Sequence, residues 1–112
     1  MPRHDLVRAR HMLDAGREVI EFTKDKSRDD LVSERMLYYS IIRLIEIIGE
    51  AANNISKDFQ AKHPSIPWSD IIAMRHRLIH GYNDINVDII WNTVEVDIPL
   101  IVTELETFLR NE

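Results

Sequence analysis

Residues 29–57 predict a helix that is apolar around most of its circumference, and this pattern restricts the possible folds more than any other feature of the chain. Its apolar positions are Leu31, Met36, Leu37, Ile41, Ile42, Leu44, Ile45, Ile47, Ile48, Ala51 and Ile55. A helix of this kind lies at the centre of a bundle or is covered by a second subunit. Because a chain of 112 residues can bury only one core, we expect a single domain over residues 1–112 with marginal stability unless the core is shared.

Three further segments also predict helices. Residues 5–24 place apolar side chains at alternating spacings of three and four, which is typical of an amphipathic helix. Residues 59–67 read as a loop, and a helix over residues 67–80 follows, with proline in its first turn and Gly81 as the residue that ends it. A last helix begins after Asn86.

Pro99 interrupts this last helical pattern, so we expect a kink or a split near Asp97. No segment alternates in the manner of a strand, and no repeat is present. The sequence therefore predicts an all-α fold, most economically an antiparallel four-helix bundle.

Composition limits the classes of function. The chain has no cysteine, so it offers neither disulfides nor a thiolate metal site, and nothing in it resembles a signal peptide or a membrane span. The cytoplasm is the expected location.

The net charge is −5, yet residues 61–82 carry three basic residues and three histidines against one acid, whereas the chain after residue 83 is acidic. This distribution suits one surface that faces RNA and another that faces a different partner.

A polar stripe runs along the long central helix at spacings of three and four. It consists of Tyr39, Arg43, Glu46, Glu50, Asn53 and Lys57. One interpretation is a solvated face stabilised slightly by an Arg43–Glu46 pair. The other is that the stripe walls a functional cleft.

The residues most suggestive of chemistry lie at 75–82, where two arginines, two histidines and a tyrosine surround a helix end. An arginine stays charged at all relevant pH values, and a histidine titrates near neutral pH. Arg75 is therefore a candidate for stabilising charge on a phosphate, and His80 for exchanging a proton with a ribose 2′-hydroxyl or a leaving 5′-oxygen. This chemistry uses the hydroxyl of RNA and requires no metal or other cofactor.

Arg75 and His80 do not share a face of one helix, because residues five apart differ by about 140° around the axis and about 7.5 Å along it. His76 and His80 are one turn apart on one face. If two copies of this helix meet across a two-fold axis, Arg75 and His80 of both chains can converge on one cleft, and activity then requires a homodimer.

Two other interpretations of the motif remain open at this point. Cations and imidazoles are favoured near the C-terminus of any helix, so the residues can be ordinary helix-terminal groups. Alternatively, His76 and His80 bind a metal with His63 as a third ligand. Arg77 follows His76 where a metalloprotease helix has glutamate, and a nearby guanidinium repels a divalent cation, so no metal site is predicted.

Arg75-x4-His80-x-Tyr82 resembles the motif of HEPN domains, and specifically of HepT-like ribonuclease toxins. The resemblance extends over nearly the whole chain, through Ile48-Gly49-Glu50-Ala51, Pro67-Trp68, Met74-Arg75 and the segment 87–91. It departs from the family at His76, where asparagine or another small polar residue is more common.

The resemblance implies an all-helical homodimer with a composite, metal-independent ribonuclease site. Arg75 and His80 are then catalytic, and His76, Arg77, Glu46, Glu50 and Asn53 line or support the cleft. It also implies a toxin–antitoxin pair, in which a minimal nucleotidyltransferase of the MntA type transfers AMP to Tyr82 and so neutralises the toxin. The alternative function is a catalytically silent helical module that binds nucleotide or protein and docks on such a nucleotidyltransferase.

Overall fold

A computed structural model describes residues 3–81 and 86–110, and all of the secondary structure in these two ranges is helical. The elements are α1 (Arg3–Thr23), α2 (Arg28–Ser33), α3 (Arg35–Asn53), α4 (Lys57–Lys62), α5 (Trp68–Ile79), α6 (Val87–Asn92), a π-helical turn η1 (Thr93–Asp97) and α7 (Ile98–Arg110). The predicted all-α class is confirmed. Tyr82 lies outside the described residues.

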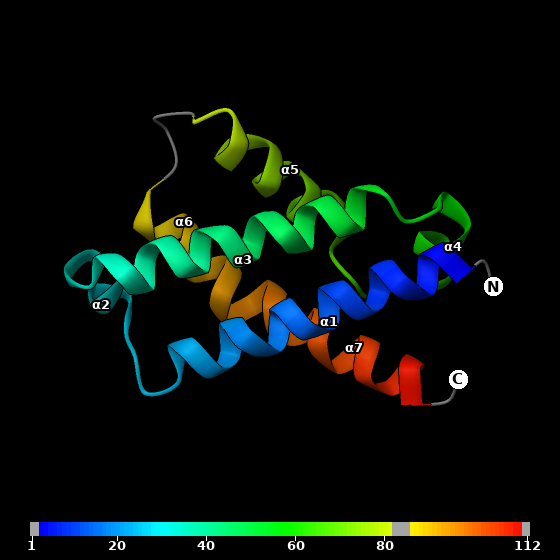
Figure 1. Cartoon of the computed structure of the whole chain (residues 1–112), viewed down its shortest axis with the longest axis horizontal. Coiled ribbons are helices and arrows are strands. Elements are labelled where there is room, and N and C mark those ends of the chain that lie inside the picture. The colour runs from blue at the N-terminus through cyan, green and yellow to red at the C-terminus, as the bar shows by residue number, and fades with distance from the viewer. Residues whose placement is uncertain (1–2, 82–85, 111–112) are drawn as a thin grey trace.

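Helix α3 is the centre of the structure, which is one of the two positions that its apolar circumference allows. It packs against α1 on one side and α5 on the other, while α1 also packs against α7 and α2 contacts α6 (Figure 1). Ile41, Ile45 and Ile48 of α3 are completely buried. The description as an antiparallel four-helix bundle and the homodimer stay predictions. Within the described ranges, no helix has the length and apolar character needed to cross a membrane.

The predicted single helix over residues 29–57 is wrong at its start. The backbone is extended at Glu34, which separates α2 from α3. The break lets α2 turn toward α6, where Arg28 Nε lies 2.6 Å from an Asp88 carboxylate oxygen and Leu31 is buried. Tertiary contacts thus interrupt a sequence whose periodicity alone favours one continuous helix.

The prediction is also wrong at the end of that helix. Helix α3 ends at Asn53, and Lys57 begins the short helix α4 rather than continuing α3. Residues 59–62, which read as part of a loop, belong to α4. The cause is local, because the Ser56 hydroxyl accepts a hydrogen bond from the Phe59 N–H and starts a new helix.

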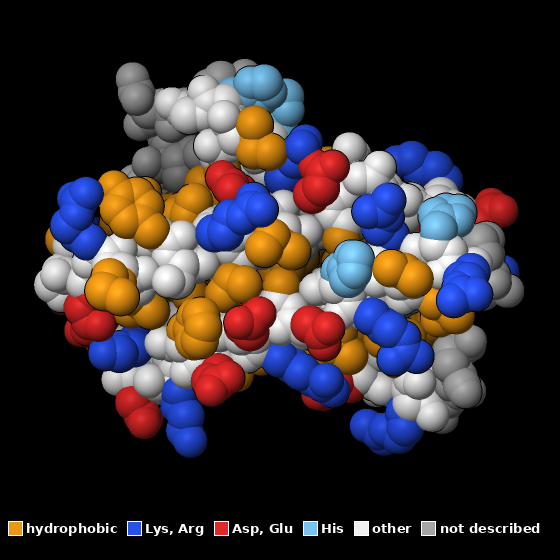
Figure 2. All heavy atoms as spheres, in the orientation of Figure 1, with side chains coloured by type: hydrophobic (Ala, Val, Ile, Leu, Met, Phe, Trp, Pro, Cys, Tyr) orange, Lys and Arg blue, Asp and Glu red, His pale blue; other side chains and the backbone are white. Residues whose placement is uncertain are grey.

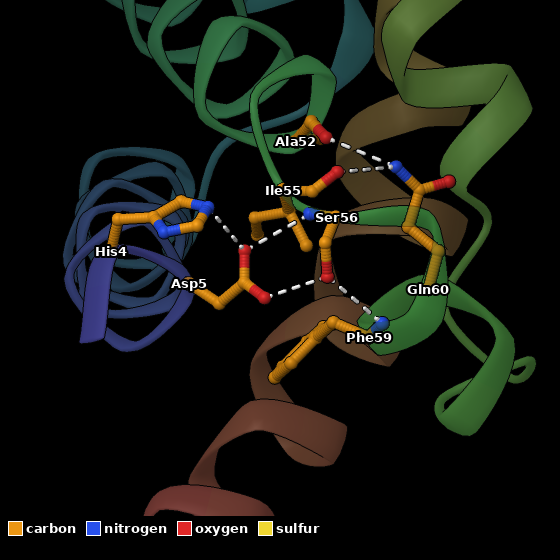
Figure 3. Close-up of polar contacts among 7 residues, drawn as sticks. All are labelled: His4, Asp5, Ala52, Ile55, Ser56, Phe59 and Gln60. Atoms are coloured by element: carbon orange, nitrogen blue, oxygen red, sulfur yellow. Dashed lines mark hydrogen bonds and ion pairs between the residues drawn. The ribbon is translucent and has the colours of Figure 1, made fainter. Parts of the chain in front are cut away.

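Asp5 of α1 fixes this second break in space. Its buried carboxylate accepts hydrogen bonds from the Ser56 N–H at 2.9 Å and from the Ser56 hydroxyl at 2.7 Å (Figure 3). Burial favours the neutral acid, but these two bonds and the nearby charge of His4 outweigh it and hold the pKa of Asp5 below its ordinary value. The first turn of α1 is thereby tied to the start of α4.

The helix that carries the motif agrees with its prediction to within one residue at each end. Trp68 is buried and donates its indole N–H to the His63 carbonyl at 2.9 Å, as expected of a core residue. Gly81 has a φ of +63°, the left-handed conformation predicted for the residue after the helix. Arg75 therefore lies in the last turns of α5, and His80 caps the C-terminus of this helix.

The C-terminal segment contains a π-helical turn rather than regular α-helix up to Asp97. In this turn the Ile98 N–H bonds to the Thr93 carbonyl five residues earlier. Pro99 follows at once and has no N–H to donate, so a change in the hydrogen-bond pattern falls where proline predicts an interruption. The kink itself stays a prediction.

Candidate active site

Gly49 creates the closest approach between α3 and α5. A Cβ at this buried position would overlap the Arg75 Cβ and lie 2.9 Å from both the Arg75 Cγ and the Ile71 carbonyl oxygen. Only glycine therefore allows the two helices to lie this close. The stem of Arg75 rests directly on the backbone of α3.

This close packing places the Arg75 guanidinium beside Glu50, the next residue of α3, with which it forms an ion pair. The Arg75 side chain is 26% exposed and the Glu50 side chain 50% exposed. The Arg75 Nε is buried and meets no hydrogen-bond acceptor in the described part of the chain. One end of the guanidinium is thus anchored in the helix contact, and the other reaches the surface.

Two grooves meet at Arg75. The first, of about 290 Å³, lies between α1, α3 and α5, and Glu46 and Glu50 line it. The second, of about 370 Å³, lies on the other side of Arg75, and Asn53, His76 and Arg77 line it. The structure therefore places all five predicted cleft residues around Arg75, but divides them between two grooves.

His80 lies apart from this contact. It caps the C-terminus of α5 and is exposed, and its ring centroid is 4.2 Å from that of His76. Within one chain, Arg75 is directed toward α3 while His80 packs against His76 at the end of α5.

The alternative metal site with His63 is not assembled. The His63 ring packs between Phe59 and Phe108, with centroid distances of 4.5 and 4.6 Å, and its Nδ1 lies 3.7 Å from a Glu104 oxygen. His63 therefore belongs to an aromatic cluster between α4 and α7. Among residues 3–81 and 86–110, no three histidine or carboxylate side chains are arranged to hold a metal ion.

Sequence reasoning missed three residues of this region. Gly49 had no assigned role, although a lone glycine inside a strongly helical pattern indicates close packing. Arg8 and His11 of α1 line the first groove beside Glu46. Their spacing of three residues on the polar face of a helix carries too little information to identify them.

Comparison with known proteins identifies the family. Residues 12–110 match the family model described as "Ribonuclease HepT-like". The chain is 40% identical over 95 residues to "Putative RNase MJ1380" of Methanocaldococcus jannaschii, which covers 85% of this chain and 87% of that protein. It is 41% identical over 86 residues to "Probable ribonuclease HepT" of Thermococcus cleftensis, covering 77% of this chain and 78% of that protein. No solved structure matches. The chain belongs to the HepT-like ribonuclease family.

Proposed function

We propose that this ribonuclease is a metal-independent endoribonuclease in which Arg75 of one copy works with His80 of another. One observation carries the proposal: α5 holds Arg75 against Gly49 and Glu50 of α3, at the junction of two grooves, but carries His80 at its exposed end. A single chain therefore presents the two groups in different directions. A second copy related by a two-fold axis can bring the missing partner to each site.

Arg75 is suited to bind the scissile phosphate. A guanidinium has five donors and remains charged, and Glu50 can occupy only part of them. A phosphate of RNA that enters either groove meets the remaining edge of the guanidinium. Negative charge grows on the phosphorus oxygens as the reaction proceeds, so a fixed cation there stabilises the transition state more than the substrate.

His80 is suited to move the proton. In the proposed reaction the 2′-oxygen forms a bond to phosphorus while the bond from phosphorus to the 5′-oxygen breaks. The 2′-hydroxyl loses its proton to a base and the departing 5′-oxygen gains one, so an imidazole, which can both accept and donate a proton, can serve either step. The products are a 2′,3′-cyclic phosphate and a 5′-hydroxyl.

Apolar side chains near the site favour pairing of two copies. Ile79, the residue before His80, is 49% exposed, and both Ile79 and the half-buried Ile47 line the groove at Arg75. Exposed aliphatic groups beside a charged groove are typical of a surface that is covered in the assembled protein.

The resemblance to HepT-like toxins implies control by modification of Tyr82. Tyr82 comes directly after Gly81 and two residues after His80. An AMP group attached there adds a bulky anion close to the proposed catalytic histidine and repels RNA phosphates. We therefore propose that the protein is the toxin of a toxin–antitoxin pair, and that a minimal nucleotidyltransferase of the MntA type is its antitoxin.

The test is RNA cleavage in EDTA, with analysis of the product ends. We expect cyclic-phosphate ends from the wild type, and no cleavage from His80→Ala despite an unchanged unfolding temperature. Cleavage by His80→Ala would refute the assignment of this residue. Absence of cleavage and of toxicity in the wild type would favour the silent binding module.

The regulatory part is tested separately by intact mass. Co-expression with a minimal nucleotidyltransferase of the MntA type should add AMP to the wild type and relieve growth arrest. Tyr82→Phe should gain no such mass. A mass increase that survives in Tyr82→Phe would place the modification at another residue.

A further inference from the structure

A second surface with features of an RNA-binding site lies at the elbow between α2 and α3, away from the contact at Gly49. Three large side chains point into solvent there: Val32 is 61% exposed, Met36 87% and Tyr39 55%. Figure 2 shows hydrophobic and basic side chains together at this end of the molecule, on the left of the view. Apolar groups exposed to this degree indicate a surface that binds something.

A hollow of about 280 Å³ opens beside Val32 and Tyr39. Its lining consists of Leu31, Val32, Arg35, Tyr38, Tyr39 and Val87. The lining is thus mostly aliphatic and aromatic, with one cation. A flat, partly apolar ligand that also carries negative charge matches this chemistry, and a nucleotide of an RNA strand is such a ligand.

Internal contacts hold Tyr39 in place. Its ring centroid lies 5.3 Å from that of Tyr38 in an edge-to-face arrangement, and the Arg35 guanidinium carbon is 5.2 Å from the Tyr39 centroid. Arg35 also donates a hydrogen bond to the Tyr39 hydroxyl at 3.2 Å. An aromatic ring fixed in this way, and still more than half exposed, provides a ready surface for stacking a base.

The hollow is connected to the proposed active site by one face of α3. Tyr39, Arg43, Glu46 and Glu50 follow one another at spacings of four, three and four residues, so they share a face of the helix. Tyr39 and Glu50 are about 16.5 Å apart along the axis. Glu50 holds Arg75. Arg43, midway along the face, pairs with Glu46 through its Nη1 at 3.4 Å, and its side chain is 71% exposed, so the rest of its guanidinium faces solvent. A strand bound at Arg75 can therefore follow α3 to Tyr39.

We infer that the hollow at the elbow binds a base of the single-stranded RNA substrate at a distance from the cleaved bond. Tyr39 stacks on the base, and Arg35 and Arg43 contact the neighbouring phosphates. This inference rests on the proposed ribonuclease function, since it identifies the substrate as single-stranded and gives it a binding surface.

The test measures binding of a fluorescent single-stranded RNA oligonucleotide to the His80→Ala protein, so that cleavage does not interfere. Adding Tyr39→Ala should weaken binding roughly 5- to 150-fold, as expected for the loss of one stacked base. Tyr39→Phe keeps the ring and its contacts with Tyr38 and the Arg35 guanidinium and loses only the hydroxyl bond, so it should weaken binding far less than Tyr39→Ala. Arg43→Gln should reduce the slope of log affinity against log salt by about 0.7, the effect of one phosphate contact. Leu100→Ala, at an equally solvent-exposed apolar residue of α7, is the matched control and should change neither.

Unchanged RNA affinity in Tyr39→Ala would overturn the inference. If that variant instead altered only the mass of the oligomer in sedimentation, the surface would be a protein contact, and the inference would be equally wrong. Failure of the catalytic proposal gives a different result: the wild type would not cleave the oligonucleotide, while binding would still depend on Tyr39.

Discussion

Replacing Gly49 by alanine is the most informative perturbation of the contact between α3 and α5. The added methyl would overlap the Arg75 Cβ and approach the Ile71 carbonyl oxygen to 2.9 Å. Because carbon atoms pack at about 3.5–4.0 Å, the helices must separate by about 1 Å or more. Overpacking of this kind lowers the free energy of unfolding by about 1–3 kcal/mol, which corresponds to a fall of about 4–15 °C in the unfolding temperature.

The same displacement moves Arg75 relative to the substrate. Misplacing a catalytic group by about 1 Å can reduce the rate by about 100-fold. We therefore expect Gly49→Ala to lose about two orders of magnitude in kcat/KM, measured at a temperature where circular dichroism shows the variant fully folded. Because the variant is fully folded at that temperature, its lower stability cannot account for this loss of kcat/KM.

Gly16→Ala provides the matched control. A Cβ at Gly16 would lie 2.7 Å from the Val102 Cγ2, at the packing of α1 against α7. This variant should also lose stability, yet cleave RNA normally once folded, because Arg75 does not move. Equal cleavage by the Gly49 and Gly16 variants would refute the idea that Gly49 positions Arg75.

Two further predictions concern stability. Ser56→Ala removes the hydroxyl that bonds to Asp5 and caps α4, and should lower the free energy of unfolding by about 1–3 kcal/mol in urea titrations. Because folding lowers the pKa of Asp5, the difference in unfolding free energy between the wild type and Ser56→Ala should have its full size above a pH of about 4. It should shrink as the pH falls through the folded pKa of Asp5. A difference that does not change with pH would contradict the role given to the Asp5–Ser56 bonds. Burial and the charge of Asp70 raise the pKa of Asp97. The folded state therefore disfavours the ionised form of Asp97, and this carboxylate lowers the free energy of unfolding at pH 7. Asp97→Asn should therefore raise the unfolding temperature at pH 7 but not at about pH 3, and a loss of stability at pH 7 would count against this reasoning.

Periodicity and local stop signals were sufficient to predict the helical class and the extent of α5, and they limited α3 to a central or a covered position. These features depend on which residues are apolar and on local stop signals such as Gly81, and the sequence shows both directly. The break at Glu34 could not be predicted in this way, because the packing of α2 against α6, which includes the Arg28–Asp88 ion pair, joins residues far apart in the sequence. Contacts between residues 60 positions apart leave no periodic pattern.

At the candidate site, too, some residues stand out in the sequence and others have roles that depend on long-range contacts. Arg75 and His80 could be proposed from the sequence because their chemistry and spacing are distinctive, and helix geometry predicts that they do not share a face of α5. The roles of Gly49 and Asp5 were not identifiable, since each depends on what packs against it: Arg75 in one case and Ser56 in the other. A glycine or an aspartate in a helix does not reveal its neighbour.

The central claim, that Arg75 and His80 act from different copies, is tested most directly with mixed dimers. Arg75→Ala and His80→Ala chains carrying different tags are co-expressed and purified through both tags, and each variant alone is expected to be inactive. A mixed dimer contains one site with both groups, so we predict about half of the wild-type cleavage rate. A mixed dimer as inactive as its parents would show that both groups must come from the same chain and would contradict the account.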